Sequence, residues 1–394
     1  MDTPEIFVIS AARTAIGTFG GSLKDVPLSD LASTAVRAAL ERSGVAPAEI
    51  GHVAMGNVIP TEPQDAYLSR IAALKAGLPH ETPCFNVSRL CGSGLQAIVS
   101  AAQSLALGDC DVALAAGAES MSRGPYLSMA SRWGARLGDA VLVDYTNAVL
   151  HDPMHKVHMG MTAENVADEY GVTREMMDEL AAESHRRAGR AIEEGRFKEQ
   201  IVPVELKTRK GTTLFERDEH VKPETTVAVL SQMKPVFRKD GRVTAGNASG
   251  INDGAAALVL ATGGAVRRLG LRPIARLVAY AHAGVDPLMM GIGPVPATRK
   301  VLARAGLAIS DLDVIEANEA FAAQACAVSR ALEFDPAKVN PNGSGISLGH
   351  PVGATGAIIT TKAIHELHRT GKRYALATMC IGGGQGIAEV FERA

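Results

Sequence analysis

The hydrophobic positions of this chain follow two different spacings. Residues 6–9 and 374–379 are short apolar runs rich in Val, Ile, Leu and Ala, a pattern typical of strands in a sheet that is covered on both faces. Residues 91–107 instead place apolar side chains every three or four positions, and Gly108 follows as a helix stop. Strands that alternate with helices in this way predict an α/β fold.

One unit of this pattern occurs twice. Residues 40–50 align without a gap with residues 302–312, which lie 262 positions later, and each copy predicts the end of a helix, a glycine stop and a strand. At the same offset residues 91–94 fall on residues 353–356, where each copy begins a further helix. The chain therefore contains a duplicated α/β unit.

A closing strand marks the end of each copy. Residues 254–260 resemble residues 386–392, so the first copy resumes near residue 245 after a long insertion. We predict two similar α/β/α halves with a loop-rich lid inserted into the first, because loops on a rigid scaffold often carry ligand contacts. The expected boundaries are residues 1–120 plus 245–270 for the N-terminal half, 121–244 for the insertion and 271–394 for the C-terminal half.

Composition mainly excludes partners. The net charge is −2 and only 4% of residues are aromatic, so nucleic acid is not expected as a partner. The longest run of small apolar residues, 254–266, falls short of the roughly 18 residues of a membrane span, and no membrane association is expected. Five scattered cysteines without a CxxC pair predict reduced thiols and a cytoplasmic location.

Cys91 lies where the first duplicated helix is predicted to begin. A thiol at a helix N-terminus is near the positive end of the helix dipole, which favours the thiolate, so Cys91 is a candidate nucleophile. A small buried apolar role fits the same position. Gly92, Gly94 and Ala97 also satisfy a loose dinucleotide-binding pattern, but no acidic residue closes the next strand as that fold requires.

Two further candidates lie in glycine-rich segments of the second half. By the repeat offset, His350 lies three positions before the partner of Cys91, and the proline after it favours an extended backbone. Cys380 ends a strand and precedes several glycines, which let the backbone approach a ligand and offer N–H groups to an oxyanion. A pseudo-twofold arrangement of the halves would bring these segments together.

Other polar residues allow more than one interpretation. Asn318 follows a predicted strand and could cap a helix over residues 319–331. Glu316 and Glu319 fit an acid/base pair or ordinary solvated carboxylates. Three histidines lie within eight residues around His158, but a proline interrupts them and no fourth ligand accompanies them, so we predict no metal site.

Four blocks of sequence resemble the thiolase family in order and spacing. They are residues 89–94 around Cys91, residues 318–321, residues 349–351 and residues 380–384. Residues 117–122 and 244–250 match as well, so the resemblance spans essentially the whole chain. Within the family the chain is most similar to bacterial biosynthetic β-ketothiolases of short-chain acyl, fatty acid or polyhydroxyalkanoate metabolism. This resemblance implies a five-layered fold built from the two halves.

The resemblance also implies the roles of the catalytic residues. Cys91, activated by His350, would attack the thioester of an acyl-CoA or 3-ketoacyl-CoA and become acylated. Cys380 would remove a proton from the methyl carbon of a second acetyl-CoA, or return it during thiolysis. Asn318, through a water, and His350 would hold one thioester oxygen, while the N–H groups of Cys91 and Gly382 would hold the other. These roles agree with the general needs of covalent and carbanion chemistry.

Coenzyme A is implied as a substrate rather than a tightly bound cofactor. Its contacts are expected from the insertion, the exit of the insertion and nearby apolar residues: His158, Met159, Lys222, Phe237, Ala248, Ser249, Met290, Ala320 and Phe321. Lys222 stands where relatives often carry an arginine, and lysine lacks the planar group that stacks on adenine. The resemblance further implies a homotetramer, held together by a loop within residues 122–139.

The expected activity is a reversible Claisen condensation. It joins two acetyl-CoA to acetoacetyl-CoA and CoA, or acetyl-CoA and a short acyl-CoA to a 3-ketoacyl-CoA. A ketoacyl synthase stays open as an alternative, but it would pair its cysteine with His/His or His/Asn where this chain has His350 and Cys380. A non-catalytic acyl-CoA or lipid-binding protein would not need Cys91, His350 and Cys380 together.

Overall fold

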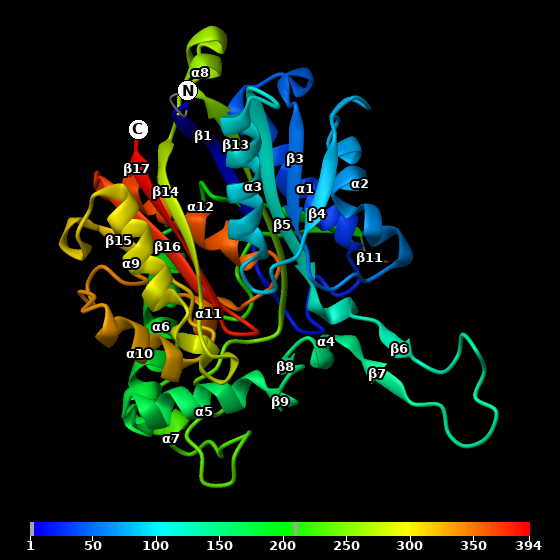
Figure 1. Ribbon diagram of the computed structural model, residues 1–394, viewed down its shortest axis with the longest axis vertical. Helices are drawn as coiled ribbons and strands as arrows, with labels where there is room; N and C mark the ends of the chain where they lie inside the picture. The colour runs from blue at the N-terminus through cyan, green and yellow to red at the C-terminus, as the bar shows by residue number, and fades with distance from the viewer. Residues whose placement is uncertain (1–3, 209–210) are drawn as a thin grey trace.

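Strands from both halves of the chain form one mixed sheet. The computed structural model describes residues 4–208 and 211–394. Within them the sheet has 11 strands, of which nine follow the order β15-β16-β17-β14-β1-β13-β5-β3-β4, while β10 and β2 pair beside this path (Figure 1). The N-terminal half supplies β1 (Ile6–Thr14), β3 (His52–Gly56), β4 (Cys84–Val87), β5 (Val112–Ser120) and β13 (Asn252–Thr262). The C-terminal half supplies β14 (Ala275–Gly284), β15 (Val314–Ala317), β16 (Tyr374–Ile381) and β17 (Gln385–Arg393).

The strand pairing of the first half is repeated in the second. Strand β3 lies parallel to both β4 and β5, and β5 pairs antiparallel with β13, which pairs with β1. In the second half β15 is parallel to β16, and β16, β17 and β14 follow as antiparallel neighbours. An isolated parallel bridge between Ile315 and Val339 takes the place of β4. The predicted duplication is confirmed.

The two halves share a sheet edge that the sequence pattern did not predict. Residues Ile6, Phe7 and Val8 of β1 pair antiparallel with the start of β14, which joins two expected sheets into one. The other end of β1 pairs with β10 (Ile201–Val202), a strand of the insertion, and β2 (Gly17–Thr18) pairs with β13. Strand β1 therefore contacts both halves and the insertion.

Helices lie between the two halves of this sheet and on their outer faces, which gives five layers: helix, sheet, helix, sheet and helix. Helices α3 (Ser93–Leu107) and α12 (Thr355–Thr370) pack on each other and contact strands of both halves, so they form the central layer. Helices α1 (Leu28–Ser43) and α2 (Leu68–Lys75) cover the outer face of the N-terminal half, and α9 (Pro294–Ala305) covers that of the C-terminal half (Figure 1). Helix α8 (Gly263–Leu269) follows β13 at the edge of this arrangement.

The two central helices touch backbone to backbone at their first turns. A Cβ atom at Gly94 would lie 2.5 Å from the backbone nitrogen of Ala357, and one at Gly356 would meet the backbone nitrogen of Leu95. Real Cβ atoms do not approach this closely, so only glycine fits at either position. This contact brings together the segments that precede both helices, which carry Cys91 and His350.

The insertion contains more helix than the loop-rich lid we expected. It includes α5 (Met159–Glu169), the 20-residue α6 (Arg174–Glu193), and short helices α4 (Tyr145–Ala148) and α7 (Val227–Ser231). Helices α5 and α6 pack on α10 (Ala322–Ala331), and α6 also packs on α11 (Gly345–Leu348), both of the C-terminal half. Apart from β10, the described strands of the insertion form three two-stranded sheets. They are β6 (Tyr126–Ser128) with β7 (Leu142–Asp144), β8 (His151–Asp152) with β9 (Val157–His158), and β11 (Val204–Thr208) with β12 (Gly211–Phe215). The β6–β7 hairpin is an arm that projects away from the body (Figure 1).

A buried ion pair fastens the insertion to the sheet. Arg13 of β1 donates to both carboxylate oxygens of Asp218, at 2.7 and 2.9 Å, and neither side chain is exposed. The same carboxylate accepts the backbone N–H of Ile16 at 2.9 Å. A bidentate pair whose remaining lone pairs are also used offsets more of its desolvation cost than a single contact does.

One helix of the described residues is long and apolar enough to cross a membrane by length and composition alone. It is the stretch Leu90–Leu107, which contains α3. Inside the protein 67% of that stretch is buried, because α3 belongs to the central layer. The core helix of a water-soluble protein passes the same test, so the match is weak evidence for a span.

The helix contact predicts that Gly94→Ala lowers the free energy of unfolding by about 3 kcal/mol, because the new methyl group would overlap the backbone of α12. Gly264→Ala in α8 is the matched control, since its Cβ would meet only Thr262 Oγ1, at 3.6 Å. That variant is expected to stay within about 1 kcal/mol of the parent. Urea unfolding of the three proteins measures both effects, and equal stability of the two variants would contradict the contact.

Candidate active site

Cys91 lies in a tight turn just before α3 rather than in its first turn. The helix begins at Ser93 with Gly92 as its N-cap, and Leu90 has a positive φ of 45°. Ser93 Oγ stabilises the turn by donating to the Leu90 carbonyl at 2.6 Å and accepting the Arg89 N–H at 2.9 Å. The predicted helix start is therefore two residues too early.

Burial raises the pKa of the Cys91 thiol above its ordinary value. The backbone N–H groups of Gly382 and of Cys91 itself point at the sulfur and oppose the shift, whereas the nearby Glu119 carboxylate adds to it. The prediction that the helix start favours the thiolate is thus wrong for the resting protein, because loss of hydration outweighs the helix dipole. Cys91 needs a partner that can take its proton.

Cys380 lies at the end of β16, close to Cys91. It is buried, and both its burial and the neighbouring Cys91 raise its pKa far above the ordinary value. The glycines after it form the turn into β17, where Gly383 and Gly384 both have a φ of 79° that other residues rarely adopt. This turn places the N–H of Gly382 beside the Cys91 sulfur.

His350 is a buried, neutral histidine with one open nitrogen. Its Nδ1 lies 2.6 Å from Thr355 Oγ1, and its backbone N–H donates to Asn252 Oδ1 at 3.0 Å. Its Nε2 is buried and has no hydrogen-bond partner among the described residues. Burial lowers the pKa of the ring to about 4. A neutral imidazole with a free nitrogen can accept a proton.

Asn318 does not cap a helix. Helix α10 begins at Ala322, and the Asn318 side chain is 1% exposed, with no partner for its Oδ1 or Nδ2 among the described residues. A Cβ at Gly345, the first residue of α11, would lie only 2.8 Å from its Oδ1. Buried amides normally have partners, so an unpartnered one indicates a place for a polar group of a ligand or a water.

Glu316 and Glu319 are neither solvated nor an acid/base pair. Glu316 Oε2 lies 2.7 Å from Lys362 Nζ, and Lys362 Nζ also donates to the Gly343 carbonyl at 2.6 Å. Glu319 accepts from Ser184 Oγ at 2.6 Å and from the Asn340 side chain at 2.9 Å. Burial raises the pKa of both carboxyls, that of Glu316 to about 7. Both support the loop that leads to His350.

Glu119 is a buried residue whose importance the sequence analysis missed. One oxygen accepts from the Asn57 side chain at 2.8 Å and the Ile59 N–H at 3.0 Å. The other accepts from the N–H groups of Val58 at 3.1 Å and Gly353 at 2.8 Å. Burial raises its pKa to about 8. It ties the N-terminal half to the loop after His350. The sequence pointed to Glu119 only through its place in the 117–122 block that resembles the family.

Eight of the nine predicted coenzyme A contacts lie together beside Cys380. His158 stacks on Phe237 with ring centres 4.6 Å apart, and Phe237 meets Phe321 edge to face at 6.4 Å. Burial lowers the pKa of His158 to about 4. The remaining members of this apolar wall are Met159, Ala248, Ser249, Met290 and Ala320, which pack with Cys380 or hydrogen-bond to a neighbour in the wall. The wall combines the insertion with the C-terminal half.

Lys222 lies apart from this wall. Its side chain is exposed, and its backbone N–H donates to His185 Nδ1 at 3.2 Å, beside the ring of His220. His220 in turn lies against Gly250, which follows the wall residue Ser249. Among the described residues no three His, Cys, Asp or Glu side chains lie together as metal ligands.

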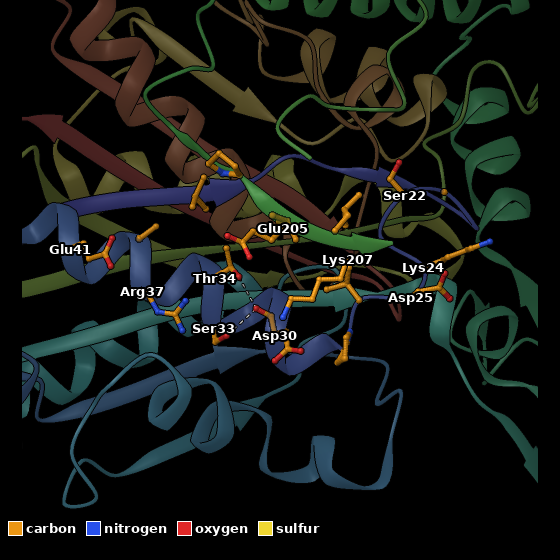
Figure 2. A pocket seen from close by; sticks show the side chains of 18 residues that line it. Ser22, Lys24, Asp25, Asp30, Ser33, Thr34, Arg37, Glu41, Glu205 and Lys207 are labelled. Atoms are coloured by element: carbon orange, nitrogen blue, oxygen red, sulfur yellow. Dashed lines mark hydrogen bonds between the residues drawn. The ribbon is translucent and has the colours of Figure 1, made fainter. Parts of the chain in front are cut away.

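A cavity of about 830 Å³ lies away from these residues. It is bounded by α1, the loop after β2 and strand β11, and none of the candidate site residues lines it (Figure 2). Figure 2 shows charges of both signs along it, among them Lys24, Lys207, Asp25 and Glu205. The cavity therefore offers no concentrated positive charge for an anionic coenzyme.

Comparison with known proteins bears on both halves of the chain. The family model for the thiolase N-terminal domain matches residues 6–264, and the model for the thiolase C-terminal domain matches residues 271–393. Beta-ketothiolase BktB of Cupriavidus necator is 64% identical over 99% of this chain and 100% of its own length. The acetyl-CoA acetyltransferase of Escherichia coli is 50% identical over 98% of each chain.

Solved structures agree with the sequence comparisons. The crystal structure of human mitochondrial 3-ketoacyl-CoA thiolase superposes with a TM-score of 0.98 and 44% identity, covering 100% of both chains. The same human enzyme in complex with CoA gives a TM-score of 0.96 over 100% of this chain and 98% of that one. The two domain models together match residues 6–264 and 271–393, and the relatives are similar over nearly their full length. The chain therefore belongs to the thiolase family.

Proposed function

We propose that this thiolase catalyses the reversible condensation and thiolysis of short-chain acyl-CoA substrates through an acyl-Cys91 intermediate. The observations that carry the proposal are two neighbouring thiols, Cys91 and Cys380, the open Nε2 of His350 and the unpartnered amide of Asn318. The names of the relatives, β-ketothiolase and acetyl-CoA acetyltransferase, support the same reaction.

Acylation of Cys91 is the first step of this proposal. His350 Nε2 takes the thiol proton, and the thiolate attacks the carbonyl carbon of the thioester. The oxyanion that forms is held by the protonated His350 and by Asn318 through a water. When the carbonyl reforms, the CoA sulfur leaves and takes the proton from His350. The raised pKa of Cys91 explains why the step needs a base.

Carbon–carbon bond formation is the second step. His350, neutral again after the first step, takes the proton of the Cys380 thiol at Nε2. The Cys380 thiolate then takes a proton from the methyl carbon of acetyl-CoA, and the resulting carbanion attacks the acyl carbon on Cys91. The N–H groups of Cys91 and Gly382, which already point at the Cys91 sulfur, hold the new oxyanion. Cys91 then leaves as a thiolate and takes the proton from His350, which completes the 3-ketoacyl-CoA and returns all three groups to their neutral state. Thiolysis runs the same steps backwards.

Coenzyme A would lie along the apolar wall next to Cys380. His158, Phe237 and Phe321 offer stacked and edge-on aromatic faces there, and the human relative was crystallised in complex with CoA. Lys222 reaches this region only through His220, so it would contribute a single charge rather than a stacking surface. Five cysteines without a disulfide support a reducing, cytoplasmic setting.

A homotetramer held by the arm is part of the same proposal. The arm between β6 and β7 exposes several large apolar side chains, with Trp133 86%, Leu137 99% and Met129 78% exposed. Apolar side chains gathered on a projecting segment are typical of an interaction surface. Residues 126–144 lie within the insertion and extend the 122–139 segment that the sequence suggested.

Incubation with acetoacetyl-CoA is expected to leave an acetyl group on the wild-type chain and none on Cys91→Ala, because the N–H groups of Gly382 and Cys91 point at the Cys91 sulfur. Intact mass spectrometry measures the adduct. Cys110→Ala, which changes a half-buried cysteine outside the site, is the control and should retain it. An acetyl adduct that persists in Cys91→Ala would sink the assignment.

Cys380→Ser is expected to take an acetyl group from acetyl-CoA onto Cys91 at nearly the wild-type rate but to condense at least roughly 100-fold more slowly, because the base of the second step is lost. Rapid-quench mass spectrometry follows acylation, and release of acetoacetyl-CoA follows turnover. Equal losses in both steps would assign Cys380 a structural role instead.

Replacing Trp133 and Leu137 together by Ser is expected to convert the tetramer into a smaller assembly while the active site stays intact, because both exposed side chains lie between β6 and β7, outside the site residues. Light scattering measures the mass of the assembly. Leu107→Ser, at an exposed apolar position at the end of α3, is the control and should leave the mass unchanged. An unaltered mass in the arm variant would contradict this role.

A further inference from the structure

We propose that Thr355 is a positioning residue that fixes the proton of His350 on Nδ1 and so keeps Nε2 open as the base for Cys91. The inference rests on the proposed function, because it assigns the partner that makes His350 a base. It starts from one contact, the 2.6 Å distance between His350 Nδ1 and Thr355 Oγ1 in a place where both side chains are buried.

The hydroxyl group of Thr355 has one proton to give. Its Oγ1 lies 2.9 Å from the Pro351 carbonyl, four residues earlier, in the geometry by which a threonine in a first helical turn donates to the preceding backbone. Because the hydroxyl proton is used there, Oγ1 accepts a hydrogen bond from Nδ1 through a lone pair. The ring must then carry its proton on Nδ1, and Nε2 keeps the lone pair.

The same contact serves after proton transfer. An imidazolium carries N–H groups on both nitrogens, and a buried Nδ1–H without an acceptor would oppose its formation. The other nearby acceptor, Asn252 Oδ1, already takes the backbone N–H of His350, and its amide nitrogen donates to the Gly17 carbonyl. Thr355 Oγ1 is the hydrogen-bond acceptor that the described residues offer the ring.

The chemical kind of the acceptor also matters. The nearby carboxylate, Glu119, is engaged by the Gly353 N–H and does not bond the ring. A hydroxyl orients the imidazole but stabilises its positive charge less than a carboxylate would. The pair of thiol and imidazole therefore stays neutral at rest, in agreement with the raised pKa of Cys91 and the lowered pKa of His350.

The chain offers a matched control on the same helix. Thr360 of α12 is also buried, and its Oγ1 donates to the Gly356 carbonyl at 3.0 Å, but it has no contact with His350. Thr360→Val removes the same kind of hydroxyl–carbonyl bond as Thr355→Val, and the two residues differ in whether they face the histidine. Any kinetic difference between the two variants reports on the ring.

The experiment measures acylation of Cys91 by acetoacetyl-CoA with rapid-quench mass spectrometry, together with steady-state kcat and KM for thiolysis. In Thr355→Val, acylation and kcat are expected to fall roughly 10- to 100-fold, the size of a general-base contribution, with KM nearly unchanged. Thr355→Ser should restore most of the rate because it keeps the hydroxyl, and Thr360→Val should acylate like wild type.

Three results would overturn the inference. They are wild-type acylation in Thr355→Val, an equal loss in Thr360→Val, and no rescue in Thr355→Ser. If Thr355→Val is not recovered folded by circular dichroism, Thr355→Ala takes its place in the same comparison. Failure of the proposed function looks different, because the wild-type chain itself would then form no acetyl adduct on Cys91.

Discussion

The site of this protein depends on the backbone contact between the first turns of α3 and α12. Gly94 and Gly356 have no side chains, so the two helix starts can approach until their peptide groups touch. The turn with Cys91 and the loop with His350 precede these helices and are brought together by the contact. Four hydrogen bonds to Glu119 then tie residues 57–59, which follow β3, to Gly353 in the loop after His350.

Burial sets the electrostatic state that this geometry creates. It raises the pKa of both thiols and lowers that of His350, so the groups stay neutral until a substrate is present. The same burial makes the stability of the folded protein depend on pH. Glu119, with its pKa raised to about 8, keeps a proton in the folded state at pH values where the unfolded chain has released it. Its contribution to stability is therefore largest below about pH 4.5 and is lost as the pH rises towards 8.

Sequence patterns predicted the duplication and the order of helices and strands in each half, since these depend on local spacing. The roles of the five catalytic candidates came from the family resemblance and stay predictions. The patterns did not predict the pairing of β1 with β14, because contacts between distant strands leave no periodic signal. The pKa of Cys91 was also missed, since a helix start is visible in sequence whereas the degree of burial is a property of the whole fold. The local pattern also suggested Asn318 as a helix cap, which is wrong, because its burial and its missing partners appear only in three dimensions.

Strand β17 has a consequence for how the protein is made. It follows every other strand in sequence, yet it lies inside the sheet between β16 and β14. A nascent chain that leaves the ribosome N-terminus first cannot complete the sheet, or the turn that carries Gly382, until β17 has emerged. Such non-local pairing slows folding and leaves sheet edges exposed in the meantime. During synthesis, protection of unpaired edges by chaperones would therefore matter for β14, which waits for β17, and still more for β1, whose partners β13 and β14 emerge much later in the chain.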